Sequence, residues 1–126
     1  MKEFVVRSDA SGVGIGAVLL QEHDDILFPV MYASRKLLPR EQAYTATERE
    51  CLAIVFAVQK FQRYIYGREF IIETDHMALE FLKRTKYSNS RVMRWSLVLQ
   101  EYQFSVRSVK GSECFGADFL SRIDMD

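Results

Sequence analysis

A chain of 126 residues with 48% hydrophobic and 13% aromatic side chains has the composition of a globular domain, which excludes an intrinsically disordered segment. Lys and Arg together number 17, as do Asp and Glu, so the net charge of zero argues neither for nor against a nucleic-acid ligand. The two cysteines, Cys51 and Cys114, are too few for a zinc site or a disulfide framework, which favours a reducing compartment. No apolar stretch approaches the roughly 18 residues of a membrane span, and Met1-Lys2-Glu3 does not begin a signal peptide. We therefore expect residues 1–126 to form a single domain.

Two apolar runs near the N-terminus predict a pair of antiparallel strands. The first run, Phe4-Val5-Val6, leads to Asp9, and the second, at 15–20, follows a turn of small residues. Glycines at positions 12, 14 and 16 leave little side-chain bulk beside Asp9, so a polymeric ligand has room to approach that carboxylate. The alternative interpretation is that Asp9 caps the turn and the glycines serve only its geometry.

The rest of the chain alternates between strand and helix patterns. Further strands are predicted at 26–33, 70–74 and 102–109, and Pro29 favours an edge position for the first of these. The strongest helix pattern covers 41–66 and stops at Gly67, and shorter helices are predicted at 76–82, 91–100 and 115–121. Trp95, within one of these helices, is expected in the core. The order of the elements predicts a mixed sheet flanked by helices, in an α/β or α+β layer architecture.

Acidic residues recur where predicted strands end. Asp9 and Asp75 each follow a strand, and they lie side by side if those strands are parallel neighbours. Two carboxylates so close repel each other unless a cation neutralises them, and hard ions such as Mg²⁺ and Mn²⁺ prefer oxygen ligands. The long helix offers Glu48 or Glu50 as a further ligand. The run from Thr47 to Glu50 also matches a capping box, and helical spacing alone does not choose between the two glutamates.

Short motifs between about residue 4 and residue 122 follow the order and spacing of a known family. They are Ser8-Asp9-Ala10-Ser11, Gly14-Ile15-Gly16-Ala17-Val18-Leu19, Tyr32-Ala33-Ser34-Arg35-Lys36-Leu37, Glu48-Arg49-Glu50-Cys51-Leu52-Ala53-Ile54-Val55, Tyr66-Gly67-Arg68-Glu69-Phe70, Thr74-Asp75-His76, Arg94-Trp95, Leu99-Gln100-Glu101-Tyr102 and Ala117-Asp118-Phe119-Leu120-Ser121-Arg122. Together they resemble the ribonuclease H domain of gypsy-type LTR retrotransposon reverse transcriptases. The resemblance implies a ribonuclease H-like α/β fold with a five-stranded mixed sheet flanked by helices. Its first three strands are antiparallel, and the fourth and fifth run parallel to the first.

Carried over position by position, the resemblance implies that the catalytic and metal-binding carboxylates are Asp9, Glu50, Asp75 and Asp118. Glu50 is preferred to Glu48 because the family's acid directly precedes the run that begins here at Cys51. The implied activity is a metal-dependent endonuclease that hydrolyses the RNA strand of RNA–DNA hybrids during reverse transcription of a retroelement. Two Mg²⁺ or Mn²⁺ ions would act in each active site. The family's arrangement has Asp9 bridging both ions, Glu50 and Asp75 on one ion and Asp118 on the other.

The same resemblance implies the partners. They are the RNA–DNA hybrid and a reverse transcriptase polymerase domain that precedes this domain in a parent pol polyprotein, in the cytoplasm or within retroelement particles. Contacts to the RNA 2′-hydroxyl groups are expected from Ser11, Gly12, Thr45 and Thr47. Residues 81–100 carry no acid and five basic side chains, which we expect to hold phosphates: Lys83, Arg84, Lys86, Arg91 and Arg94. An ordinary solvated helix face is the alternative interpretation of that stretch.

Three positions depart from the family's usual pattern. Ser108 stands where histidine or tyrosine is common, Cys114 where asparagine is common, and Ser8 where threonine is usual. None of these departures removes a proposed metal ligand. The main alternative is a catalytically weak or inactive connector or domesticated module that binds nucleic acid or a partner domain, and the four retained carboxylates argue against it. Another nuclease or an integrase of the same fold is a third hypothesis, against which the motif at 117–122 argues.

Overall fold

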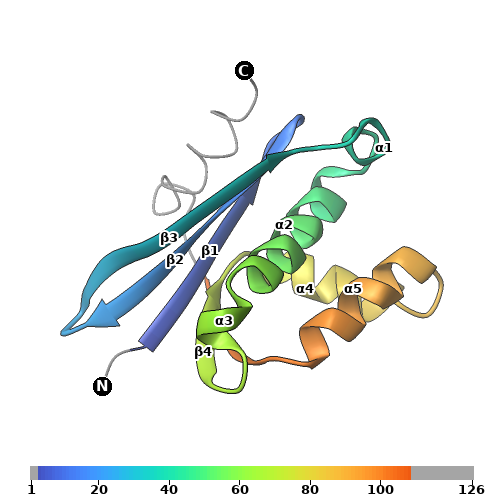
Figure 1. Cartoon of the computed structure of the whole chain (residues 1–126). Helices are drawn as coiled ribbons and strands as arrows, with labels where there is room; N and C mark the ends of the chain where they lie inside the picture. The colour runs from blue at the N-terminus through green and yellow to red at the C-terminus, as the bar shows by residue number, and fades with distance from the viewer. Residues whose placement is uncertain (1–2, 109–126) are drawn as a thin grey trace.

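The computed structural model describes residues 3–108, in which a five-stranded sheet carries the described helices on one face (Figure 1). In chain order the elements are β1 (Glu3–Ala10), β2 (Gly14–His23), β3 (Ile26–Lys36), α1 (Pro39–Gln42), α2 (Ala46–Lys60), α3 (Gln62–Ile65), β4 (Glu69–Glu73), α4 (His76–Thr85), α5 (Ser90–Gln100) and β5 (Gln103–Arg107). The strand order is β3-β2-β1-β4-β5. β2 is antiparallel to both β1 and β3, whereas β4 pairs in parallel with both β1 and β5. The predicted five-stranded mixed sheet, with the fourth and fifth strands parallel to the first, is confirmed.

β3 lies at an outer edge of the sheet, the position that Pro29 predicted. The prediction ended this strand at residue 33, but it continues to Lys36 because residues 34–36 pair with residues 14–16 of β2. A bulge interrupts the pairing between β2 and β3 next to Pro29. With this extra length, β3 pairs along the whole of β2 before α1 begins.

The single helix predicted over 41–66 is in fact three helices. α2 begins directly after Thr45, whose Oγ1 accepts a hydrogen bond from the Glu48 backbone N–H at 3.1 Å. In return, the Thr45 N–H donates to Glu48 Oε1 at 2.9 Å, which closes a capping box. At the other end, Phe61 leaves the helical backbone conformation with its ring fully buried, and this separates α2 from α3. Gly67 follows α3 with a φ of 81°, as its predicted role in stopping the helix requires.

The later elements lie close to their predicted positions. α4 extends to Thr85 instead of residue 82, and β5 covers Gln103–Arg107 instead of 102–109. The helix predicted at 115–121 lies outside the described residues.

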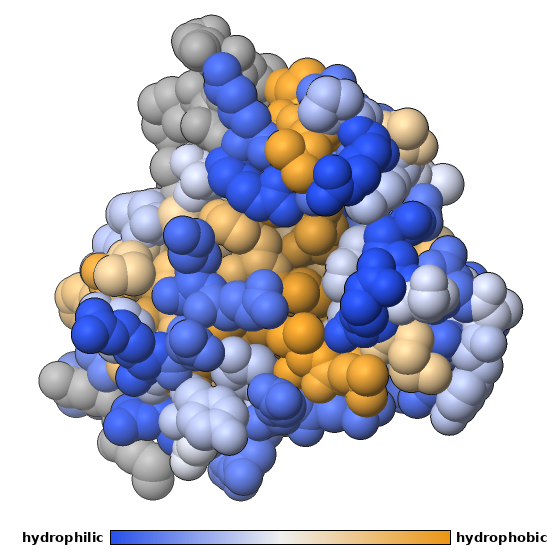
Figure 2. Space-filling view, turned by 45° about the vertical axis from the view of Figure 1, so that its right-hand side comes forward, coloured by the Kyte–Doolittle hydropathy of each residue, from blue (hydrophilic) through white to orange (hydrophobic). Residues whose placement is uncertain are grey.

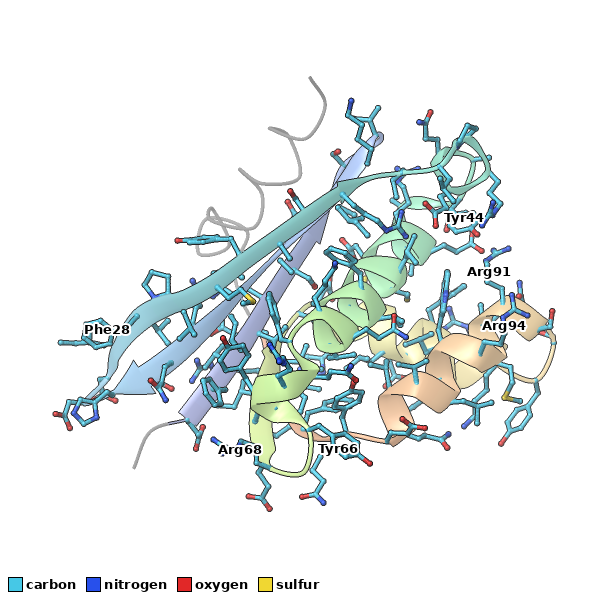
Figure 3. The ribbon with its side chains drawn as sticks, in the orientation of Figure 1. Phe28, Tyr44, Tyr66, Arg68, Arg91 and Arg94 are labelled. Carbon is cyan, nitrogen blue, oxygen red and sulfur yellow. The ribbon has the colours of Figure 1, made fainter. Side chains whose placement is uncertain are left out.

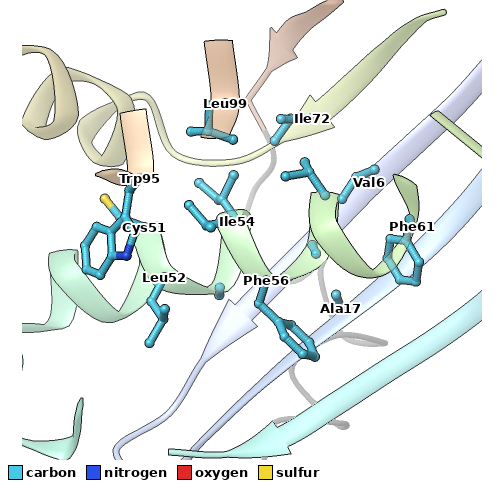
Figure 4. Packing of buried hydrophobic residues seen from close by; sticks show 14 of the residues in the cluster. Val6, Ala17, Cys51, Leu52, Ile54, Phe56, Phe61, Ile72, Trp95 and Leu99 are labelled. Carbon is cyan, nitrogen blue, oxygen red and sulfur yellow. The ribbon is translucent and has the colours of Figure 1, made fainter. Parts of the chain in front are cut away.

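The main core fills the layer between the helices and the sheet, and α2 runs through its centre (Figure 4). α2 contacts β1 and β2 on one side and α4 and α5 on the other. Buried members of this core from strands and helices alike include Val6, Ala17, Ile54, Ile72, Trp95 and Leu99. Trp95 is 8% exposed, which confirms its predicted place in the core. On the opposite face of the sheet, a smaller cluster of Val5, Val18 and Leu20 is also buried.

The surface combines hydrophilic side chains with a few apolar ones. Figure 2 shows hydrophobic residues gathered in a hollow near the middle of one face, with hydrophilic residues around it. On β3, the side chains of Ile26, Phe28 and Tyr32 are about half exposed, so this edge strand also presents apolar surface. Within residues 3–108, every helix is too short or too polar to cross a bilayer.

Candidate active site

The ends of β1 and β4 bring two predicted site residues to neighbouring positions. These strands are parallel, with Arg7 opposite Glu73. Two residues beyond this pair lie Asp9, after Arg7, and Asp75, after Glu73. Asp9 is half-buried and lies opposite Gly16 of β2, where the missing side chain leaves room beside the carboxylate. Because parallel neighbouring strands present their carboxyl ends at the same edge, the predicted pairing of these two strand ends is confirmed.

Asp75 sits where β4 gives way to α4. Its side chain is exposed, and Oδ1 accepts a hydrogen bond from the Met77 backbone N–H at 2.9 Å, so Asp75 is the N-cap of α4. A capping carboxylate has a fixed position at the start of a helix, and its second oxygen remains available for another ligand.

Glu50 of α2 supplies a second carboxylate within electrostatic reach of Asp75. Burial raises the pKa of the Glu50 carboxyl, and the negative charge of Asp75 raises it further. Among residues 3–108, no basic side chain forms a salt bridge with Glu50. A half-buried carboxylate near a second acid, with no salt bridge to it among residues 3–108, is the kind of oxygen donor that a hard dication neutralises.

Glu48 has a different role, and the prediction of a capping box at 47–50 was wrong. The glutamate that bonds back to the helix start is Glu48, because the N-cap is Thr45. Glu48 also pairs with the Arg91 guanidinium. Burial opposes ionisation of Glu48, but the hydrogen bonds from Thr45 and Arg91 outweigh it and lower the pKa of Glu48. The oxygens of Glu48 are thus occupied by other groups of the protein, whereas Glu50 is the helix acid whose pKa the charge of Asp75 raises.

The chemistry of these carboxylates fits Mg²⁺ or Mn²⁺, but the described residues do not complete a metal site. Residues 3–108 contain no group of three or more His, Cys, Asp and Glu side chains close enough together to hold an ion. Asp118, the fourth predicted ligand, lies outside the described residues. The set of four metal-binding carboxylates therefore stays a prediction.

The side chains predicted to contact RNA lie around the turns near these acids. Ser11 Oγ accepts hydrogen bonds from the backbone N–H groups of Val13 and Gly14 in the β1–β2 turn. Gly12 is exposed, and nothing lies within 4 Å of a Cβ added there, so a ligand can approach its backbone closely. Thr45 serves as the N-cap of α2, and Thr47 is half-buried in the first turn of the same helix.

The five predicted phosphate-binding side chains do not have equal access. Lys83, Arg84 and Arg94 are exposed, and Lys86 is half-buried at the end of α4. Arg91, by contrast, lies against the protein beside Tyr44 and bonds to Glu48, so it ties α5 to the start of α2 (Figure 3). Its guanidinium carbon is 4.1 Å from the centre of the Tyr44 ring. A phosphate at Arg91 would share this guanidinium with Glu48.

Sequence reasoning missed a network of charges beneath the strand ends. Glu73 is 2% exposed and accepts hydrogen bonds from Arg7 Nε at 2.8 Å and from Arg107 Nη2 at 2.7 Å. Arg107 Nη1 also reaches Glu22 Oε2 at 3.3 Å. The available signal was a single charge ending each of two apolar strand runs, an arginine after Phe4-Val5-Val6 and a glutamate after the run at 70–72. Opposite charges at equivalent positions of neighbouring strands favour a cross-strand pair.

Comparison with known proteins agrees with the fold. A family model described as the RNase H-like domain found in reverse transcriptase matches residues 1–102. The retrovirus-related Pol polyprotein from transposon 297 of Drosophila melanogaster is 42% identical over 125 residues, which cover 99% of this chain and 11% of that protein. The Pol polyprotein from transposon gypsy of the same organism is 41% identical over 126 residues, which cover 99% and 12%. The chain thus spans only a small part of the curated relatives that it matches.

Solved structures support the same fold at low sequence identity. LC11-RNase H1, in a crystal structure with an RNA/DNA hybrid, has a TM-score of 0.66 at 11% identity, covering 98% of this chain and 97% of that one. The foamy viral protease-reverse transcriptase in complex with an RNA/DNA hybrid has a TM-score of 0.57 at 16% identity, covering 98% of this chain and 20% of that one. These matches and the Drosophila relatives confirm the resemblance that the motifs predicted. Since the family model covers most of the chain and the strand order agrees with it, the chain belongs to the family of RNase H-like domains found in reverse transcriptases.

Proposed function

We propose that this domain is a ribonuclease H that hydrolyses the RNA strand of RNA–DNA hybrids with the help of two divalent ions, Mg²⁺ or Mn²⁺. The observation that carries the proposal is the position of Asp75 and Asp9 at the ends of two parallel neighbouring strands, with Asp75 close enough to Glu50 for its charge to raise the pKa of that carboxyl. A domain that only connects others has no use for a half-buried glutamate on α2 whose ionisation is opposed by burial and by the charge of Asp75. Asp118 is proposed as the fourth ligand on the strength of the family motif.

The chain's own residues would position the ions and the phosphodiester. Glu50 and Asp75 form one side of the site, with Asp75 fixed as the cap of α4, and Asp9 extends the negative centre along β1. When bound, the ions activate a water molecule and stabilise the leaving oxygen of the cleaved bond. The open surface at Gly12 gives the sugar-phosphate chain a path to the carboxylates.

Recognition of the hybrid would combine two kinds of contact. Polar groups of the β1–β2 turn and of the start of α2 lie where 2′-hydroxyl groups could be bound, which is how proteins distinguish RNA from DNA. The exposed Lys83, Arg84 and Arg94 supply positive charge for phosphates of the complementary strand. Binding through these side chains weakens as salt increases, because each phosphate contact releases counterions.

The partner proposed for the domain is a reverse transcriptase polymerase domain of the same polyprotein. The curated relatives are Pol polyproteins in which the match covers 11% to 12% of the length. A viral protease-reverse transcriptase with the same fold over 20% of its chain was solved on an RNA/DNA hybrid. We infer that this domain acts on hybrids produced by such a polymerase, in the cytoplasm or in retroelement particles.

Cleavage of a labelled RNA–DNA hybrid by the purified chain tests the proposal. We expect RNA-strand products with Mg²⁺ or Mn²⁺, and at least a hundredfold loss of rate in Asp75→Asn. Asparagine caps helices as well as aspartate does, so the variant keeps the fold while losing the charge. Glu80→Gln removes an exposed acid from the same helix and serves as the matched control, with an unchanged rate.

Two outcomes would contradict the proposal. Cleavage that persists in EDTA would exclude the metal-dependent mechanism. A chain that binds the hybrid under all ionic conditions but never cuts it would be a binding module, the alternative that the sequence left open.

A further inference from the structure

The charge network of Glu73, Arg7 and Arg107 lies on the sheet face away from the described helices. Val5 and Ile71 belong to the small cluster on that face, and alternate strand residues share a face, so Arg7 and Glu73 lie there too. The Glu73 carboxylate is 2% exposed and binds one guanidinium from each strand that flanks β4. A single buried acid therefore holds two cations, which is a charge-assisted arrangement.

This network is adjacent to the candidate active site along the backbone. Arg7 precedes Asp9 by two residues on β1, so the two side chains leave the same face roughly 7 Å apart along the strand. The Arg107 carbonyl accepts a hydrogen bond at 3.2 Å from the N–H of Thr74, the residue directly before Asp75. Each arginine thus lies within a side chain's length of a carboxylate that the proposed function needs for divalent ions.

We propose that Glu73 is a positioning residue for metal binding: it holds the guanidinium groups of Arg7 and Arg107, and so keeps these cations from competing with divalent ions for Asp9 and Asp75. The inference rests on the proposed function, since it assigns a role toward the same ions. Without the negative charge at Glu73, the Arg7 guanidinium loses its charged partner and Arg107 keeps only the longer contact with Glu22, so both cations are drawn to other nearby acids. The acids that follow on the adjoining backbone are Asp9 and Asp75.

Calorimetric titration with Mn²⁺ in the absence of nucleic acid tests this role without any measurement of activity. We expect Glu73→Gln to bind Mn²⁺ at least tenfold more weakly than the native chain. The double variant Glu73→Gln/Arg7→Gln removes one released cation together with the acid and should recover binding to within about threefold of native. A merely structural role for Glu73 predicts the opposite, because the double variant loses more contacts than the single one.

Glu41→Gln is the matched control for the loss of a buried, arginine-bound glutamate. Glu41 is 6% exposed and receives two hydrogen bonds from Arg35, at 2.7 Å and 3.0 Å, but Arg35 belongs to β3, which is not a neighbour of β1 or β4 in the sheet. We expect this variant to lose stability and to keep native Mn²⁺ affinity. A similar loss of affinity in Glu41→Gln and Glu73→Gln would overturn the proposal.

A further single variant keeps the inference testable if Glu73→Gln does not fold. Arg7→Gln leaves Glu73 with Arg107 and removes one cation near Asp9, so it should bind Mn²⁺ at least as tightly as the native chain. Weaker binding by Arg7→Gln would overturn the proposal. If the native chain itself binds no Mn²⁺, the proposed function fails; if it binds and Glu73→Gln binds equally well, only this inference fails.

Discussion

Replacing the two glutamates in the first turns of α2, one at a time, should have opposite effects on stability and on activity. The changes are Glu50→Gln and Glu48→Gln, which remove one charge each with almost no change in shape. Glu48 is bound by Thr45 and Arg91, whereas Glu50 faces the charge of Asp75 without a salt bridge among the described residues. We expect Glu48→Gln to lower stability and keep activity, and Glu50→Gln to raise stability and abolish activity.

The structure gives the size of the expected stability change for Glu48→Gln and the direction of that change for Glu50→Gln. Glutamine at position 48 can still cap the Thr45 N–H, so the loss is mainly the charged partner of Arg91, a pair with side chains 14% and 30% exposed. Partial screening reduces this to about 1 kcal/mol, or about 4 °C in Tm for a domain of this size. The pKa of Glu50 is raised in the folded chain, so its ionised form at neutral pH is less favourable there than in the unfolded chain. Glutamine removes that charge, and Tm should rise.

Thermal unfolding at neutral pH, followed by cleavage of a labelled hybrid, tests both variants together. Glu50→Gln should have a higher Tm than the native chain. Its cleavage rate should be at least a hundredfold lower, because a proposed metal ligand is removed. Glu48→Gln should melt below the native chain and cut at a native rate at a temperature where both are folded. Loss of cleavage in Glu48→Gln with full cleavage in Glu50→Gln would refute the assignment of the helix acid.

Two further changes test the fold itself. Arg35 and the Leu38 N–H lower the pKa of Glu41 from its ordinary 4.5, so the stability that this carboxylate contributes is complete above that pH and disappears as the pH falls through the lower folded value. The difference between native and Glu41→Gln in urea unfolding should therefore be about 1.5–3 kcal/mol near neutral pH and should close on acidification; a constant difference would contradict the ion pair. Gly67→Ala should cost about 1 kcal/mol in the same assay, since φ is 81° and nothing lies within 4 Å of the new methyl group, with no effect on hybrid cleavage.

The sheet and its connections could be predicted from the sequence because each strand carries its own local signal. Pro29 indicated the edge strand, and the family resemblance implied that the strands leading to Asp9 and Asp75 are parallel. The break of the long helix was not predictable in this way. The apolar spacing continues through Phe61, so periodicity sees one helix, while the backbone there turns to bury the ring.

The choice between Glu48 and Glu50 shows where sequence reasoning about the site ends. Both lie at helical spacing that reaches the sheet edge, and the deciding facts are the N-cap at Thr45 and the bond from Arg91, which is 43 residues away in the chain. The role of Glu73 was missed for a similar reason, because its partners come from two other strands. The charges that end the two apolar runs were visible in the sequence, but their pairing depends on which strands become neighbours in the sheet.

The irregular pairing beside Pro29 has a consequence for how the molecule behaves at high concentration. An edge strand with half-exposed aromatic side chains can pair with the edge strand of another molecule, and repeated pairing of this kind leads to aggregation. A residue without an amide hydrogen, next to a bulge, breaks the even ladder of donors and acceptors that such growth requires. β3 can therefore expose apolar side chains without pairing with a strand of another molecule.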